Sequence, residues 1–309
     1  MNTTRLLMEV ICKACSFEIS EQVLNKYCIC QSCGSAMYVT SSSASEDNKE
    51  YFNKIYSDNK LHVNQGRKRQ FERFLWLDTI MHAGETASFG QFQSKISDLI
   101  VGAEKSVEIG FGRGDELVKF LQAGANMHGL DLSSEAVGNF KERHPEYSDR
   151  VACATTFDFS ADMVYSNALF EHLDDPGELL DNAGKMLNPG GRLVVRLPVM
   201  TRMIRHRNET ETDINFWKPC HRALYTLKGL TILLEKHGFR IMAHASLAYY
   251  GYKVMSRMLR LGYDDIVYAR CPYYQIKGLD SDFVYNKILL QSLFDKVICS
   301  DFALIAARN

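Results

Sequence analysis

The chain has 309 residues, of which 46% are hydrophobic, so it is long enough for about two domains and can bury a full core. Its 36 basic and 37 acidic side chains leave a formal charge of −1, so the composition gives no sign of a polyanionic partner such as nucleic acid. No run reaches the ~18 apolar residues of a membrane span, and the N-terminus lacks the apolar core of a secretory signal, which favours a cytoplasmic protein.

Cysteine pairs near the N-terminus predict a metal site. Two Cys-x-x-Cys pairs are spaced so that four thiolates can surround one tetrahedral zinc ion: Cys12, Cys15, Cys30 and Cys33. The segments between the pairs read as short strands, so residues 1–40 are expected to form a zinc ribbon. Cys28 offers an alternative ligand, but its spacing to Cys33 is looser, so we assign Cys30. Four thiolates leave no open coordination position, so the expected zinc is structural.

The next segments connect this ribbon to the rest of the chain. Residues 41–50 are Ser-rich and charged, without apolar periodicity, and are predicted to be a linker. Residues 51–101 are predicted to be helical, including the run FERFLWLDTIM and the run FGQFQSKISDLI. From residue 102 onward, strands and helices alternate, which is typical of an α/β domain with a parallel sheet.

The most specific pattern lies between residues 106 and 131. An apolar strand that contains Glu108 ends in three glycines, Gly110, Gly112 and Gly114, and a second strand ends in Asp131. Glycine lets the backbone approach a ligand without a Cβ clash. An acid at the end of the next strand, about 20 residues on, accepts hydrogen bonds from ribose hydroxyls.

Acidic residues at the start of the following helix narrow the choice of ligand. Asp115 stands where a dinucleotide-binding motif has its third glycine, and Glu116 follows it. Two acids at this position would repel a pyrophosphate. The pattern favours a ligand with a ribose and a cationic amino acid, in which Glu108 faces the ammonium and Asp131 the ribose.

At these residues the chain resembles the class I S-adenosylmethionine (SAM) methyltransferases. Glu108–Gly114 is similar to their first motif and Gly129–Ser133 to their second. Later stretches resemble further motifs in order: FDFSADMVYSNALFEHLDDP at 157–176, LNPGGRLVVRLP at 187–198, and the helix and turn at 221–239. The resemblance implies an α/β, Rossmann-like seven-stranded sheet whose last strand is antiparallel.

That fold places the elements of the domain at residues 102–309. Strands are expected near 106–110, 126–131, 150–154, 162–167, 191–197, 239–246 and 301–307. Residues 248–298, rich in tyrosine, are expected to be a mostly helical insertion that lines an acceptor pocket, forms a packed cap or offers a dimer face. Helices at 51–101 would cap the cofactor pocket, with Tyr51 and Tyr56 as candidates for contact; ordinary helix packing explains them as well.

The resemblance also assigns residues to SAM. The methionine part belongs at the glycine turn, the adenine beside Leu132, and the methyl group near Asn167 and Ala168. Thr156, Phe157 and Asp158 are candidates for the adenine edge. The expected cofactor residues are therefore Glu108, Gly110, Phe111, Gly112, Gly114, Asp131, Leu132, Phe157, Asn167 and Ala168.

Two histidines are candidates for the base that an alcohol acceptor requires. His172 follows the fourth strand, beside Glu171, and His221 precedes the helix before the sixth strand. A structural role explains either histidine equally well. The basic run at 202–207 fits a phosphate or carboxylate on the substrate, or a solvated face.

The leading interpretation is a SAM-dependent methyltransferase that acts on a small molecule or carbohydrate, with O-methylation favoured. One alternative is an RNA methyltransferase that binds RNA through the ribbon, but residues 9–40 contain only Lys13 and Lys26 as basic residues. The other is a non-catalytic SAM-binding subunit. A homodimer is compatible with the sequence.

Overall fold

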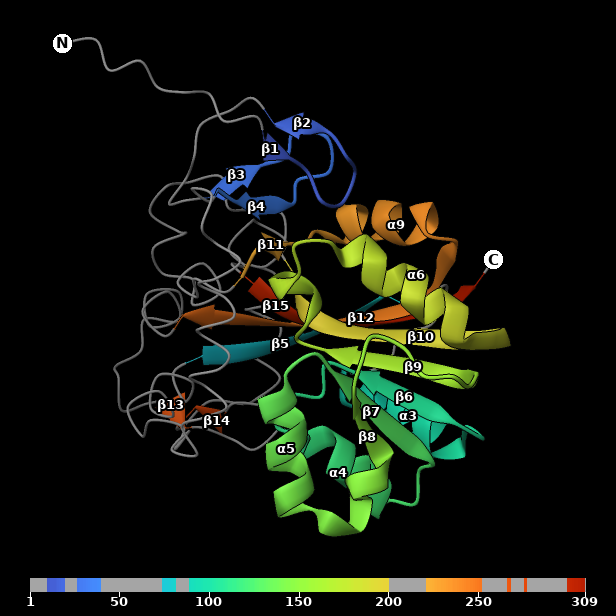
Figure 1. The fold of residues 1–309 in the computed structure, drawn as a ribbon. Helices are drawn as coiled ribbons and strands as arrows, with labels where there is room; N and C mark the ends of the chain where they lie inside the picture. Colours follow the sequence, from blue (N-terminus) through green and yellow to red (C-terminus); the bar gives the residue numbers. More distant parts are fainter. Residues whose placement is uncertain are drawn as a thin grey trace, which may run out of the picture.

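A computed structural model describes residues 10–19, 27–39, 74–81, 89–199, 221–251, 266–267, 275–276 and 299–308. Their central feature is an eight-stranded sheet in the order β5-β12-β15-β10-β9-β6-β7-β8 (Figure 1). The strands are β5 Phe74–Met81, β6 Ser106–Ile109, β7 Met127–Asp131, β8 Val151–Cys153, β9 Ala161–Asn167, β10 Leu187–Val199, β12 Phe239–Gly251 and β15 Cys299–Arg308.

Seven of these strands are the ones that the sequence predicts. Strands β10, β9, β6, β7 and β8 pair in parallel, and β15 lies between β10 and β12, antiparallel to both. The expectation of a Rossmann-like sheet with an antiparallel last strand is therefore confirmed. In its second half β10 is buried on both faces, with Leu193 and Val194 in different core clusters, which explains the run of three consecutive apolar residues at 193–195.

The eighth strand corrects the sequence analysis. Residues 74–81, in the run that we expected to be helical, form β5, which pairs antiparallel with β12 from Phe74 opposite Gly251 to Met81 opposite His244. An apolar run of this length fits a buried helix or a strand, and periodicity alone does not separate them. Pairing with the edge of the long strand β12 makes this segment a strand and not a helix.

Helices cover both faces of the sheet (Figure 1). Helices α6 Pro176–Met186 and α9 Leu227–Lys236 pack on one face. The other face carries α3 Phe89–Gly102, α4 Asp115–Gln122 and α5 Ser134–Arg143, so the helix predicted within 89–101 is confirmed. Two short 3-10 helices are η1 Pro145–Arg150 and η2 Phe170–His172.

Short strands flank the two N-terminal cysteine pairs, as the sequence predicts, and the four predicted zinc ligands lie in the turns between these strands. β1 Val10–Ile11 pairs with β2 Glu18–Ile19, and β3 Tyr27–Ile29 pairs with β4 Ala36–Tyr38. β4 also pairs with β11 Ala223–Leu224, which belongs to the segment before α9. The ribbon is therefore joined to the rest of the protein by a shared sheet, above α6 and α9 in Figure 1.

The insertion at 248–298 differs from expectation wherever it is described. Residues 248–251 extend β12, and β13 Ile266–Val267 pairs with β14 Gln275–Ile276, so these parts are strands and not helices. The described residues include no helix long and apolar enough to cross a membrane. The linker at 41–50, Tyr51, Tyr56, the basic run at 202–207 and most of the insertion lie outside the described residues.

Candidate active site

The glycine turn after β6 has the backbone that its sequence requires. Gly110, Gly112 and Gly114 all have positive φ, at 72°, 53° and 74°, a region that favours glycine. A Cβ on Gly110 would lie 2.7 Å from Leu169 Cδ2, and one on Gly114 would lie 2.3 Å from the Phe140 ring. Both the conformation and the close packing therefore select glycine.

Asp131 ends β7 beside this turn. Its Oδ2 accepts a hydrogen bond from the Gly112 N–H at 2.9 Å, and its Oδ1 accepts one from the Ser133 N–H at 2.9 Å. Burial raises the pKa of Asp131, although these backbone hydrogen bonds oppose the shift. Each carboxylate oxygen has a second lone pair, so the side chain can still accept from a ligand hydroxyl.

A cavity of about 580 Å³ opens at the carboxyl ends of β6, β7, β8 and β9. This size is typical of a small-molecule site, and the position is where ligands of open α/β sheets bind. Four predicted cofactor residues and one predicted base line it: Gly110, Asp131, Leu132, Ala168 and His172. Leu132 is 74% exposed, which leaves its apolar side chain available to a ligand ring.

Sequence reasoning missed several other lining residues. Ser133, Ser134 and Glu135 begin α5; Ala154 and Thr155 follow β8; and Leu173, Asp175, Glu178, Leu179 and Asn182 continue from η2 into α6. Asp175 caps α6, because its side chain accepts a hydrogen bond from the Gly177 N–H at 2.9 Å. The sequence Asp-Asp-Pro-Gly-Glu is a helix-start signal that could have located this wall.

Glu108 lies behind the turn, buried, and does not line the cavity. Its Oε2 has no hydrogen-bond partner among the described residues. Burial, with repulsion from Glu116 and Asp131, raises its pKa to about 8. A buried acid surrounded by other acids is suited to pair with a cation, because a cation would relieve both the repulsion and the missing contact.

Three other predicted cofactor residues point elsewhere. Phe111 is in the core against Phe140, with the two ring centroids 5.4 Å apart. Phe157 stacks on Phe159 at 4.6 Å, and Asn167 donates to Glu116 Oε2 at 3.0 Å. None of the three lines the cavity.

The carboxylate of Glu116 accepts hydrogen bonds from polar side chains of two strands, β9 and β10. Besides Asn167, its carboxylate accepts hydrogen bonds from the Tyr165 hydroxyl at 2.5 Å and from Arg196 Nη1 at 3.0 Å. Burial raises the pKa of Tyr165, so its hydroxyl keeps the proton that it donates. Arg196 neutralises part of the acidic charge that surrounds the turn.

The two candidate bases lie together. The rings of His172 and His221 meet edge to face with centroids 4.8 Å apart, and His172 Nε2 lies 3.8 Å from Glu171 Oε1. His172 lines the cavity, whereas His221 and Glu171 are buried. One ligand atom from each of the three lies within 4.8 Å of the others, so the group could hold a proton or a cation.

The four predicted zinc ligands also converge. The ligand atoms of Cys12, Cys15, Cys30 and Cys33 all lie within 4.8 Å of one another, and Cys28 is not part of this group. Both pairs have the same turn: the N–H of Ser16 donates to Cys12 O and the N–H of Gly34 to Cys30 O, each at 2.8 Å. Four thiols in this arrangement fit a tetrahedral zinc ion.

The sheet order and the glycine turn facing an acid on the next strand define a class I SAM-dependent methyltransferase. The family described as "Methyltransferase domain" matches residues 82–244, just over half of the chain, and the chain belongs to this family.

Two curated relatives are named a C-methyltransferase and an N-methyltransferase. The chain is 26% identical over 199 residues to C-methyltransferase NovU of Streptomyces niveus, covering 55% of this chain and 46% of that protein. It is 31% identical over 117 residues to phosphoethanolamine N-methyltransferase 2 of Caenorhabditis elegans, covering 35% and 25%. The chain thus spans less than half of the length of these two relatives.

Among solved structures, geranyl diphosphate C-methyltransferase from Streptomyces coelicolor A3(2) has a similar fold. The TM-score is 0.50 at 13% identity, and the match covers 87% of this chain and 99% of that one. At this identity the similarity concerns the fold alone.

Proposed function

We propose that the protein transfers the methyl group of SAM to a hydroxyl of a small-molecule or carbohydrate acceptor. The observation that carries this proposal is the cavity at the carboxyl ends of the strands, which is lined by Gly110, Asp131 and His172. The family match supports SAM as the methyl donor. When bound, SAM would supply a sulfonium methyl group whose carbon bonds to an acceptor oxygen as the carbon–sulfur bond breaks, and the leaving group is a neutral thioether.

The residues around the turn fit this cofactor in charge and shape. Asp131 accepts from the ribose hydroxyls, and Leu132 packs on the adenine. The Oε2 atom of Glu108 has no hydrogen-bond partner among the described residues. From behind the turn, the negative charge of this acid attracts the cationic amino acid part of SAM. Gly112 and Gly114 shape the turn, and Ala168 follows β9 at the cavity wall. Because Phe111, Phe157 and Asn167 do not line the cavity, we give them no contact with SAM.

His172 is the better placed of the two candidate bases, because it lines the cavity and His221 is buried behind it. In this proposal His172 accepts the proton that the acceptor hydroxyl loses as its oxygen bonds to the methyl carbon. His221 and Glu171 hold the His172 ring in place.

Zinc bound by Cys12, Cys15, Cys30 and Cys33 is proposed to be structural. Four protein thiolates complete a tetrahedral shell and leave no position for a substrate. The metal would therefore act by folding the ribbon and by fixing what the ribbon contacts.

The test is a methyl-acceptance screen with SAM carrying a deuterated methyl group, against nucleotide-sugars, free sugars and phenols, read by mass spectrometry. We expect a labelled product with wild-type protein, and a loss of about 100-fold or more in turnover for His172→Ala. His172→Ala turnover equal to wild type would remove His172 as the base. Absence of transfer to any acceptor, despite SAM binding, would favour the non-catalytic alternative.

C-methylation is a second candidate, because NovU is named a C-methyltransferase. It would use the same cavity, with His172 accepting a proton from an activated carbon. Carbon-13 NMR of a product made with SAM that carries a carbon-13 methyl group separates the two candidates, since an oxygen-bound methyl resonates far downfield of a carbon-bound one.

A further inference from the structure

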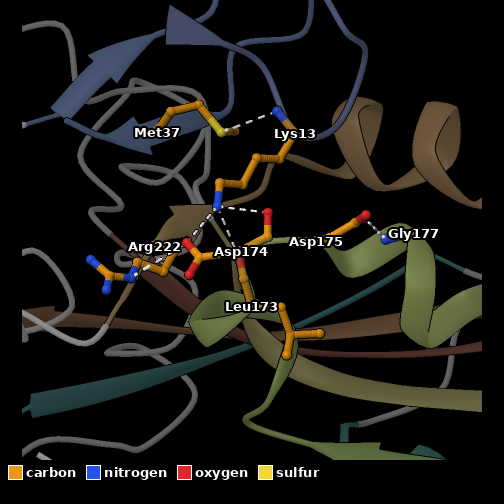
Figure 2. A network of polar contacts seen from close by, with 7 residues as sticks. All are labelled: Lys13, Met37, Leu173, Asp174, Asp175, Gly177 and Arg222. Carbon is orange, nitrogen blue, oxygen red and sulfur yellow. Dashed lines mark hydrogen bonds and ion pairs between the residues drawn. The ribbon is translucent and has the colours of Figure 1, made fainter. Parts of the chain in front are cut away.

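Lys13 of the ribbon reaches across to the wall of the cavity (Figure 2). Its Nζ donates a hydrogen bond to the Asp174 carbonyl oxygen at 2.8 Å and another to the Leu173 carbonyl oxygen at 3.3 Å. It also pairs with Asp174 Oδ1 at 3.1 Å, which lies 3.6 Å from Arg222 Nε. One ribbon side chain thus holds two consecutive carbonyl groups of the catalytic domain.

The segment that Lys13 holds belongs to the cavity wall. Leu173 lines the cavity, and so do His172 before it and Asp175 after it. Backbone hydrogen bonds at this 3-10 turn run from the His172 N–H to Leu169 O, from the Leu173 N–H to Phe170 O and from the Arg222 N–H to Glu171 O. Lys13 adds two hydrogen bonds from the ribbon, to the carbonyl oxygens at the end of this turn.

The carbonyl contacts matter more than the ion pair. The Asp174 side chain is 63% exposed, so its Coulomb attraction to Lys13 is screened by water. The Lys13 side chain is only 21% exposed, and a charged donor to a backbone carbonyl makes a stronger bond than a neutral one.

The metal-binding turn sets the position of Lys13. Lys13 lies between Cys12 and Cys15, and its own N–H points to Met37 Sδ at 3.4 Å (Figure 2). The Tyr27 hydroxyl makes a second link, donating to the His221 carbonyl oxygen at 3.0 Å. The ribbon therefore contacts the backbone of His221 and the backbone just after His172.

We propose that Lys13 is a positioning residue of the cofactor pocket, through which the zinc ribbon fixes the wall at 173–175. This rests on the SAM site proposed above. Because binding free energies are linked, zinc in the ribbon then strengthens SAM binding, and SAM strengthens zinc binding by the same factor.

The test compares SAM dissociation constants by calorimetry for the zinc-loaded full chain and for Lys13→Met, which keeps the length of the aliphatic stem. We expect SAM binding to weaken about five- to tenfold, corresponding to a partly exposed charged hydrogen bond. Backbone amides at 169–175 should exchange hydrogen faster, and Lys13→Arg should recover most of the affinity. An unchanged dissociation constant in Lys13→Met with full zinc content would overturn the proposal.

Lys228→Met is the matched control, since Lys228 Nζ also donates to a ribbon carbonyl, that of Ser32, at 2.6 Å, but does not line the cavity. Its SAM affinity should stay within about twofold of wild type. If Lys228→Met lost as much SAM affinity as Lys13→Met, Lys13 would have no special role among the ribbon contacts, and the proposal would be overturned.

If Lys13→Met loses zinc, Asp174→Lys decides, because a positive charge at position 174 repels the Lys13 ammonium from both carbonyl oxygens and leaves the ribbon sequence unchanged. SAM binding weakened about two- to threefold with zinc retained supports the proposal, and unchanged binding overturns it. Failure of Asp131→Ala to weaken SAM binding would instead overturn the proposed SAM site.

Discussion

The N–H of Gly112 donates a hydrogen bond to Asp131 Oδ2 at 2.9 Å, which joins the glycine turn after one strand to the acid that ends the next. The two motifs that are separate in sequence are thus one structural unit. Its acid is oriented before any ligand arrives, so a ribose would bind without the cost of ordering that side chain.

The buried Glu108 makes the stability of the protein depend on pH. Its pKa is about 8 in the folded protein against an ordinary value of 4.5, so the folded state holds the extra proton between these values. Its contribution to stability is therefore present at low pH and is lost as pH rises through 8. Glu108→Gln should unfold like wild type near pH 5 and be more stable by a few kcal/mol at pH 8.5. Urea denaturation measures the free energy of unfolding of both proteins at each pH. Equal free energies for wild type and Glu108→Gln at both pH values would contradict the assignment.

SAM binding should release a proton from Glu108. At pH 7 the acid is protonated in the free protein, and an approaching ammonium favours its ionised form, so affinity should rise with pH up to about 8. Calorimetry at pH 7 in buffers with different ionisation enthalpies should report release approaching one proton. Glu108→Gln should abolish that release; a release that persists in the variant would come from another group.

The neighbouring cysteines Cys28 and Cys30 should behave differently. Cys30 is in the four-thiol group and Cys28 is not, although both are buried. Cys30→Ala should lose zinc and unfold the ribbon, whereas Cys28→Ala should retain one zinc per chain. Metal analysis of the purified variants decides this, and zinc retained by Cys30→Ala with loss from Cys28→Ala would reverse our choice.

Gly110→Ala should impair the cavity beyond the cost of its backbone strain. The new Cβ would meet Leu169, which lines the cavity, and would push it inward. Gly124→Ala is the control, because Gly124 has φ of 91° but open space around it. Each should cost about 1–2 kcal/mol of stability from the left-handed backbone, but only Gly110→Ala should weaken SAM binding. Adding Leu169→Ala should restore part of that affinity; if it restores none, the clash is not the cause.

Local sequence predicted the parts of the site that depend on backbone. Glycines at Gly110, Gly112 and Gly114, the acid at Asp131 and the two cysteine pairs each require a particular turn, and the structure has those turns. The alternation of strands and helices indicated a parallel sheet, and the resemblance to the methyltransferase family implied its seven strands with an antiparallel last strand.

What the sequence could not predict depends on packing between distant segments. Phe157 lies two residues after the cavity residue Thr155, but it stacks on Phe159 and packs against the core. The run at 74–81 becomes a strand only because β12 offers it an edge. Lys13 reaches Asp174 through tertiary contact alone, so no motif could have indicated it.

The central claim is that this cavity binds SAM, and isothermal titration calorimetry of SAM into wild-type protein and Asp131→Ala tests it most directly. The account predicts one SAM per chain for wild type and at least about tenfold weaker binding for Asp131→Ala, since the ribose would lose hydrogen bonds to a charged acceptor. Asp131→Asn should fall between them. No heat of binding with wild type, or equal affinity in Asp131→Ala, would contradict the account.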